Sequence, residues 1–581
     1  MLQKNPQPIH ATIFLLLASS GAILRCVSVL QKENARNIPA SEKEEFETVV
    51  NTTKGTVKGF ITKSSLEKPV RVFYGIPYAQ PPTGKHRFRR ARSKEPWTDV
   101  FEATVKPNSC VQTIDDTYGN FSGSVMWNAN TNMSEDCLKL NVWTPVPPSK
   151  KPLAVLVWIY GGGFYSGTST LDVYDARNLV SEEDVIVVSM NYRVASLGFL
   201  SFGNELVPGN AGLYDQCMAL KWVRDNIAAF GGDPNRVTLF GESAGAGSVA
   251  LHVLSPLSRR LFKRAILQSG SGIAPWSFRS KRKAREAARK LARALGCPTG
   301  LDNKTLSCLR KKDPKDIVYN ETNNGGVIDL AFGPVADGAF LPKSPRALVY
   351  DPEFETNISV MVGSNLNEGS YFLQYFFGFS ATDQNPNITE NNFTAAVKAL
   401  NPSLGEPPMA EVLKQYTNGT VPSTPRDMLV ALDSIVGDYY LTCPVVQWAD
   451  RFMKVGAQVY EYVFARRASH DPWPRWIGVM HGAEVAFVFG EPFNDTLEYD
   501  EDDKTVSRLM MNYWSNFAKT GNPNRPENGT SYNTTWPRRT QPSKQHLVLN
   551  VNETVGCAHR VEYCKFWGRI RHNWTPPSPS C

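Results

Sequence analysis

The feature that most constrains the fold is a short apolar run that ends in a pattern of glycine and serine. The run Val237–Phe240 leads into Gly241–Gly245, which reads G-E-S-A-G, and a helix-compatible segment follows. G-x-S-x-G between a strand and a helix predicts a turn so tight that its two glycines are required. Such a turn lifts the central hydroxyl above the sheet. We therefore expect Ser243 to be an exposed nucleophile.

Other short apolar runs, rich in β-branched residues, predict the sheet to which this turn belongs. The central runs lack polar alternation, which is typical of strands buried on both faces of a mainly parallel sheet. Helical patterns between them indicate the α/β class, with a large mixed, mostly parallel central sheet flanked by helices. The predicted strands are 70–74, 138–143, 154–159, 185–189, 236–240, 264–268, 359–363 and 459–464, and the predicted helices are 215–230, 281–295 and 503–520.

Composition supports one large folded domain. Hydrophobic residues make up 42% and charged residues 20% of the 581 residues, which excludes a mainly disordered chain, a collagen and a coiled coil. The formal net charge of +8 is mild when it is spread over this length. It does not indicate nucleic-acid binding, which needs a clustered basic face. The basic run in the predicted helix 281–295 is interpreted as a solvated face.

The two ends of the chain predict export. Lys4 precedes the apolar run 13–18 and several small residues, as in a secretory signal peptide, which we assign to residues 1–30. No later stretch approaches the roughly 18 uncharged apolar residues of a membrane span. Fourteen Asn-x-Ser/Thr sequons also favour a secreted, extracellular protein.

The cysteines add a prediction about assembly. If Cys26 leaves with the signal peptide, nine cysteines remain. An odd number in a secreted chain indicates a partner on another chain. Cys581, at the end of the Pro/Ser tail 571–581, is the natural candidate.

A glycine-rich loop is the candidate for stabilising the oxyanion that forms when Ser243 attacks a carbonyl group. The apolar run 154–159 ends in Gly161–Gly163. Backbone N–H groups of such a loop, together with the N–H of Ala244 after the nucleophile, are the donors that an oxyanion requires.

The general base is expected among the C-terminal histidines, because the acid and then the histidine follow the serine in this arrangement. His481 is favoured, since an apolar approach and Gly482 leave it accessible to a substrate. The other candidates lie in a loop, in a strand or beside arginines: His470, His546, His559 and His572.

The acid is expected after a strand between the serine and the histidine. Glu368 is the first carboxylate after the predicted strand 359–363, and Asp337 is the alternative, in a segment that resembles a turn. Its role would be to hold the histidine tautomer and to stabilise the imidazolium.

At these residues the chain resembles the cholinesterases of the type-B carboxylesterase family, from about Thr53 to Trp567. The motifs that carry the resemblance are 134–138 (S-E-D-C-L), 160–167 (Y-G-G-G-F-Y-S-G), 231–235 (G-G-D-P-N), 240–246 (F-G-E-S-A-G-A) and 517–523 (F-A-K-T-G-N-P). The resemblance implies an α/β-hydrolase catalytic domain at residues 31–570, with no metal and no cofactor. It implies a triad of Ser243, Glu368 and His481, with oxyanion donors from Gly162, Gly163 and Ala244.

The resemblance also implies the covalent links of the chain. The expected disulfides are Cys110–Cys137, Cys297–Cys308 and Cys443–Cys564. Cys581 is expected to join two subunits into a homodimer, and Cys217 and Cys557 are left free.

A choline site distinguishes cholinesterases from other members of the family. Trp127, inside the loop closed by Cys110 and Cys137, matches the choline-binding tryptophan, and an aromatic face attracts a quaternary ammonium group. The resemblance places Tyr371 as a second aromatic wall and Glu242 as the electrostatic partner of the cation. The implied residues at the rim of the gorge are Asp115, Tyr165 and Tyr375.

The implied acyl pocket departs from that of acetylcholine-selective vertebrate enzymes, which is narrowed by two phenylalanines. Ile328 and Leu330 take those positions, as in butyrylcholinesterase, with Trp276 as another wall and Phe332 as a further substrate-binding residue. The expected function is therefore secreted hydrolysis of choline esters, with butyrylcholine and acetylcholine hydrolysed at comparable rates. The alternatives are a general carboxylesterase with a detoxifying or sequestering role and a non-enzymatic adhesion ectodomain.

Overall fold

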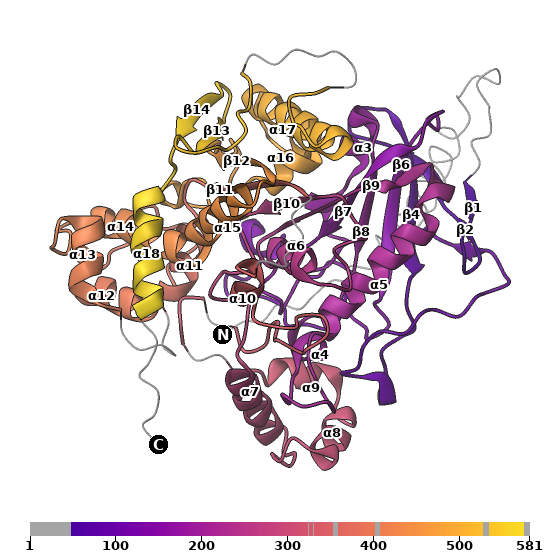
Figure 1. The fold of residues 1–581 in the computed structure, drawn as a ribbon, viewed down its shortest axis with the longest axis horizontal. Coiled ribbons are helices and arrows are strands. Elements are labelled where there is room, and N and C mark those ends of the chain that lie inside the picture. Colours follow the sequence, from indigo (N-terminus) through magenta and orange to yellow (C-terminus); the bar gives the residue numbers. More distant parts are fainter. Residues whose placement is uncertain are drawn as a thin grey trace, which may run out of the picture. The chain divides into compact units, whose positions relative to one another are not determined.

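An 11-stranded sheet forms the centre of the described part of the chain (Figure 1). The computed structural model describes residues 48–573 except 323–324, 329, 352–357, 401–406 and 527–533. The predicted signal peptide 1–30 and Cys581 lie outside these residues. From one edge to the other, the strands are β14 (Thr554–Cys557), β13 (Gln545–Leu549), β12 (Gln458–Phe464), β11 (Ser359–Asn365), β10 (Arg264–Gln268), β9 (Gly232–Glu242), β7 (Leu153–Ile159), β8 (Ile186–Met190), β6 (Lys139–Pro145), β4 (Pro69–Pro77) and β3 (Phe60–Lys63).

The direction of the strands confirms a mixed, mostly parallel sheet. The strands from β13 through β8 pair in parallel, whereas β14 at one edge and β6, β4 and β3 at the other pair antiparallel. All five residues of β8 and six of seven in β7 are buried. Burial on both faces explains why these strands are continuous apolar runs in the sequence. A separate three-stranded sheet contains β1 (Val49–Asn51), β2 (Thr56–Lys58) and β5 (Phe101–Glu102).

Helices cover both faces of the large sheet (Figure 1). One group packs together against β4, β6, β7 and β9: α3 (Arg177–Glu183), α16 (Val485–Phe489) and α17 (Glu501–Thr520). The other face contacts α5 (Ala211–Asn226), α6 (Ala244–Leu254) and α15 (Cys443–Lys454). The remaining helices are α2 (Ser122–Val125), α4 (Ala195–Phe199), α7 (Lys281–Ala294), α8 (Asn303–Arg310), α9 (Pro314–Tyr319), α10 (Pro345–Val349), α11 (Ser370–Phe377), α12 (Glu390–Lys398), α13 (Met409–Thr417), α14 (Pro425–Gly437) and α18 (Val561–Asn573).

The three helices predicted from the sequence are present, with small changes at their ends. Helix α5 begins four residues before the predicted start, and its predicted last turn, Ile227–Phe230, is a 3₁₀ helix that ends at Gly231. Helix α17 begins two residues early because the Asp500 side chain accepts a hydrogen bond from the Asp503 N–H and caps it.

One long helical stretch was not predicted. Helices α14 and α15 are continuous through a π-helical turn, Asp438–Thr442. The whole stretch, Pro425–Lys454, is long and apolar enough by composition to cross a membrane, and 78% of its most apolar window is buried inside the fold. Such burial is typical of a core helix.

Candidate active site

The turn between β9 and α6 has the geometry that its glycines predict. Ser243 lies between the two elements with φ of 55° and ψ of −121°, a strained conformation for a residue with a side chain. A Cβ atom on Gly245 would lie 1.9 Å from the Ile159 carbonyl oxygen, and one on Gly241 would lie 2.5 Å from it. The close approach of β7 therefore excludes side chains on both sides of Ser243.

The favoured acid and base are in contact. Nδ1 of His481 lies 2.7 Å from Oε2 of Glu368. The other carboxylate oxygen of Glu368, Oε1, accepts a hydrogen bond of 2.7 Å from the Asn365 N–H at the end of β11. A backbone bridge between Asn367 and Met480 holds the two loops together. The imidazole is thus oriented by a buried carboxylate, as a general base requires.

The rival residues lie in other environments. Asp337 forms the turn that its sequence suggests, where it accepts hydrogen bonds from the Tyr214 hydroxyl and the Leu341 N–H. His546 lies in β13 and packs against the ring of His559. None of these residues lines the cavity described next.

A cavity of about 460 Å³ brings most of the predicted site together. It contains residues from segments that are hundreds of positions apart in the sequence. The predicted site residues that line it are Asp115, Trp127, Gly162, Gly163, Tyr165, Glu242, Ser243, Trp276, Ile328, Leu330, Tyr371, Tyr375 and His481. Phe332 does not line it in the described part of the chain and is buried in the core instead.

The glycine-rich loop after β7 lies beside the nucleophile. A Cβ atom on Gly161 would lie 3.0 Å from Cβ of Ser243. Gly162 and Gly163 both have positive φ angles, 92° and 59°, and a Cβ atom on Gly162 would lie 2.5 Å from the Ser166 carbonyl oxygen. Ala244 begins α6, whose N-terminus carries partial positive charge. These backbone groups form an environment suited to a developing oxyanion.

Trp127 and Glu242 approach each other where Gly482 leaves space. A Cβ atom on Gly482 would lie 3.4 Å from the Trp127 ring and 3.8 Å from Oε1 of Glu242. The absence of a side chain at Gly482 therefore opens a compartment with one aromatic and one acidic wall, next to His481. These two kinds of wall suit an organic cation.

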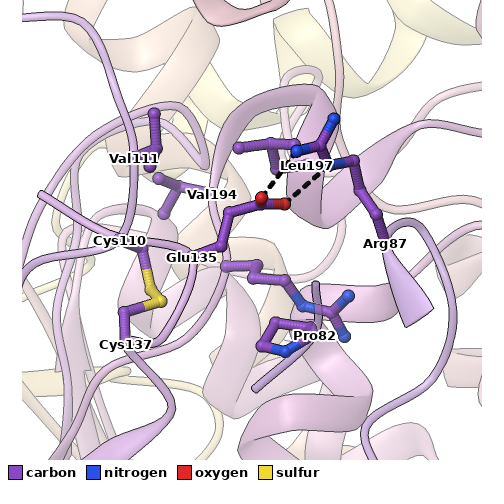
Figure 2. A pocket seen from close by; sticks show the side chains of 9 residues that line it. Pro82, Arg87, Cys110, Val111, Glu135, Cys137, Val194 and Leu197 are labelled. Carbon is purple, nitrogen blue, oxygen red and sulfur yellow. Dashed lines mark hydrogen bonds and ion pairs between the residues drawn. A yellow bond between two sulfur atoms is a disulfide. The ribbon is translucent and has the colours of Figure 1, made fainter. Parts of the chain in front are cut away.

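The loop that carries Trp127 is closed at its base by a disulfide. Cys110 and Cys137 are joined, and the neighbouring Glu135 forms a two-point ion pair with Arg87 at 2.6 and 2.7 Å (Figure 2). The other two implied disulfides, Cys297–Cys308 and Cys443–Cys564, are also present. Cys217 is a buried free thiol and Cys557 an exposed one.

An aromatic cluster lines the side of the cavity near Asp115. The Tyr375 hydroxyl donates to Oδ2 of Asp115 at 2.7 Å, and the Tyr371 hydroxyl lies 3.3 Å from that of Tyr375. Trp473 packs edge-on against Tyr371 at a centroid distance of 5.9 Å. Trp473 was not predicted from the sequence, since a buried aromatic residue in a loop has no periodic pattern.

The predicted acyl-pocket residues lie next to the glycine-rich loop. A Cβ atom on Gly163 would lie 3.2 Å from Cδ2 of Leu330. Trp276 donates from its indole nitrogen to the Tyr440 carbonyl at 3.0 Å, which fixes its ring. Because Leu330 lies against a predicted oxyanion donor, its size limits the space for the acyl chain.

Three buried carboxylates surround His481. Nε2 lies 3.1 Å from Oε1 of Glu242. Burial raises the pKa of Glu242 to about 8. Burial by itself would lower the pKa of His481, but Glu242 and Glu368 raise it to about 9. The third carboxylate, Glu484, accepts hydrogen bonds from Asn365 and Gln268, and burial raises its pKa. Glu484 was not predicted as a site residue, although it stands only three residues after His481.

Comparison with known proteins agrees with this architecture. The model of the carboxylesterase family matches residues 47–567. The chain belongs to the carboxylesterase family. It therefore has the α/β-hydrolase fold and is a serine hydrolase of carboxylic esters. Among the described residues, no group of three or more His, Cys, Asp or Glu side chains is arranged to hold a metal ion.

Proposed function

We propose that this protein is a cholinesterase of the acetylcholinesterase type with a relaxed acyl pocket. The observation that carries the proposal is the compartment between Trp127 and Glu242, in the same cavity as Ser243 and His481. An aromatic face and an adjacent carboxylate would hold a quaternary ammonium group. A general carboxylesterase that acts on neutral esters has no need of such a compartment.

The proposed reaction assigns a role to each of these side chains. His481 takes the hydroxyl proton of Ser243 through Nε2 while its Nδ1–H donates to Glu368. The serine oxygen attacks the ester carbonyl carbon, and the oxyanion accepts hydrogen bonds from the N–H groups of Gly162, Gly163 and Ala244. His481 then gives its proton to the leaving choline oxygen. Water, deprotonated by the same imidazole, hydrolyses the acyl-enzyme.

The proposal includes the location and assembly of the protein. Three disulfides are typical of the secretory pathway, and we propose that the chain is secreted and pairs through Cys581 into a homodimer. Electrophoresis of the secreted protein with and without reductant tests the dimer. A Cys581→Ser variant that still migrates as a dimer without reductant would contradict this link.

The test of the activity compares acetylcholine with 3,3-dimethylbutyl acetate, in which a neutral carbon replaces the ammonium nitrogen. A cholinesterase should show a kcat/KM at least tenfold higher for acetylcholine. Labelling of Ser243 by an organophosphate would establish the nucleophile independently. Equal kcat/KM values for the two esters, with Ser243 labelled, would favour a general carboxylesterase.

A further inference from the structure

The net charge of the chain is concentrated in one region and is not spread over its length. Residues 281–316 contain 12 Lys and Arg but only 4 Asp and Glu, whereas the rest of the chain contains 51 of each. These 36 residues thus account for the whole formal charge of +8. These residues form α7, α8 and the start of α9, which lie together in Figure 1. We call this region the basic segment.

Helix α7 concentrates these charges on its outer side. Its buried face is apolar and contains Ala284, Ala288, Leu291 and Ala292. A row of cations recurs at every fourth position: Lys281, Arg285, Arg289 and Arg293. Positions four apart are neighbours on one face of a helix, so the row runs for about 18 Å along the helix axis. The first, second and fourth of these side chains are exposed, and the third is half-buried.

This arrangement opposes the stability of the helix itself. Like charges four residues apart repel each other. Cations in the first turn also oppose the helix dipole, and the first turn of α7 has no acidic residue. Glu286, the one acidic residue of α7, pairs with Arg282. A sequence that served helix stability would alternate the signs, so the row is better explained by an anionic partner.

A second basic element lies beside the basic segment. Residues 85–94 contain six Lys and Arg and no acidic residue. Arg87 in this loop donates to the carbonyl groups of Leu309, Arg310 and Lys312, while Glu135 holds its other nitrogens (Figure 2). The Arg310 side chain in turn donates to the Arg87 carbonyl. These bonds fix the loop against the end of α8, within the basic segment.

The disulfide Cys297–Cys308 gives this surface further rigidity. It joins the residues just after α7 to α8. A partner that binds here does not need to order the backbone, which lowers the entropic cost of association.

We propose that this surface binds a sulfated glycosaminoglycan. A linear polyanion matches a row of cations, and basic runs of this kind bind heparin or nucleic acid. The disulfides indicate an oxidising compartment, where sulfated glycans and not nucleic acids are the abundant polyanions. A lipid surface fits less well, since membrane-binding helices insert large apolar side chains and the apolar face of α7 packs against the protein.

The surface is separate from the candidate active site. None of the basic residues of α7, α8 or the loop 85–94 lines the cavity that contains Ser243. Glycan binding therefore does not depend on the proposed choline-ester activity, and either proposal can fail alone.

The test measures binding of the full-length secreted protein to immobilised heparin between about 50 and 300 mM NaCl. The variant Lys281→Gln/Arg285→Gln/Arg289→Gln/Arg293→Gln should bind at least tenfold more weakly at 150 mM. If each of the four cations releases about one counterion, the slope of log K against log salt should fall by about three to four. The matched control changes four exposed lysines on other elements, Lys150→Gln/Lys151→Gln/Lys454→Gln/Lys565→Gln, and should bind within twofold of the wild type.

Three results would overturn the proposal. One is failure of the wild type to bind heparin at 150 mM NaCl. Another is an equal loss of affinity in the α7 variant and the control. The third is tighter binding to phosphatidylserine vesicles or duplex DNA than to heparin. Esterase activity and melting temperature, measured on both variants, establish that each is folded.

Discussion

The Nε2 atom of His481 lies 3.1 Å from the Oε1 atom of Glu242. In the proposed mechanism this nitrogen accepts the Ser243 proton, because Nδ1 is held by Glu368. In that mechanism Glu242 stabilises the imidazolium that forms during the reaction. By raising the pKa of His481, it also keeps more of the free enzyme in the protonated form, which cannot act as the base. The balance between these effects should appear in the pH dependence.

We expect Glu242→Gln to move the acid limb of kcat/KM to lower pH by about one unit. The limb reports the pKa of His481, since activity is lost when the base becomes protonated as the pH falls. Glu242 raises this pKa, so removal of its charge lowers it. Measurement of kcat/KM with a neutral ester from about pH 6 to 10.5 covers this limb and separates the effect from cation binding.

The control is Glu484→Gln, another buried glutamate changed in the same way. Glu484 raises the pKa of His481 less than Glu242 does. The acid limb of kcat/KM should therefore shift less in Glu484→Gln than in Glu242→Gln. An unchanged limb in Glu242→Gln would show that this carboxylate does not act on the base.

Trp127→Ala tests the cation compartment. Loss of one ring should remove roughly 0.5–2 kcal/mol of binding to a quaternary ammonium group. KM for acetylcholine should then rise about 2- to 30-fold, while KM for 3,3-dimethylbutyl acetate changes less than twofold. Trp476→Ala is the control, because Trp476 does not line the cavity. Equal changes in KM for both esters would contradict the proposed choline site.

Leu330→Phe tests the acyl pocket. The larger ring, beside Gly163, should reduce kcat/KM for butyrylcholine about tenfold or more and leave acetylcholine within threefold. The wild type should hydrolyse both esters at comparable rates. Leu330→Met keeps the volume and should preserve this ratio. A wild-type enzyme that already rejects butyrylcholine would contradict the relaxed pocket.

The parts of the fold that could be predicted are those with a local signal. Strands buried on both faces, such as β7 and β8, are continuous apolar runs. The turn at Ser243 could be predicted because its two glycines are a steric necessity. The helix Pro425–Lys454 was missed, since a π-helical turn and Pro444 interrupt its pattern between α14 and α15.

Site residues could be predicted where they fit a sequence motif. They could not be predicted where three-dimensional packing determines which residues meet. Glu368 follows a strand and could be selected on that basis. Glu484 and Asp433 are single carboxylates whose partners come from distant segments. Phe332 stands two residues from Leu330 in the sequence, yet only Leu330 lines the cavity in the described residues. The basic segment was also not predicted, because the net charge was summed over the whole chain and not over short stretches of it.

Asp433 on α14 should position the acid and the base together. Its Oδ1 accepts hydrogen bonds from the N–H groups of Gly369 and Ser370, and its Oδ2 accepts one from the Asn367 side chain. Asn367 in turn accepts a hydrogen bond from the Val479 N–H, two residues before His481. The loop of Glu368 and the loop of His481 are thus joined through one buried carboxylate.

Asp433→Asn should lower kcat about tenfold with little change in KM. The amide has only one acceptor oxygen, so one of the groups that donate to Asp433 loses its partner or faces an NH₂ group.

Burial raises the pKa of Asp433 to about 7, above the unfolded value near 4. Its contribution favours the folded state at low pH and is lost as the pH rises through 7. Between pH 6 and 8, the free energy of unfolding should therefore fall by about 1–2 kcal/mol more in the wild type than in Asp433→Asn. Chemical denaturation at both pH values measures the difference, with Asp427→Asn on the exposed side of α14 as the control. Parallel curves for wild type and Asp433→Asn, together with unchanged kcat, would exclude this role.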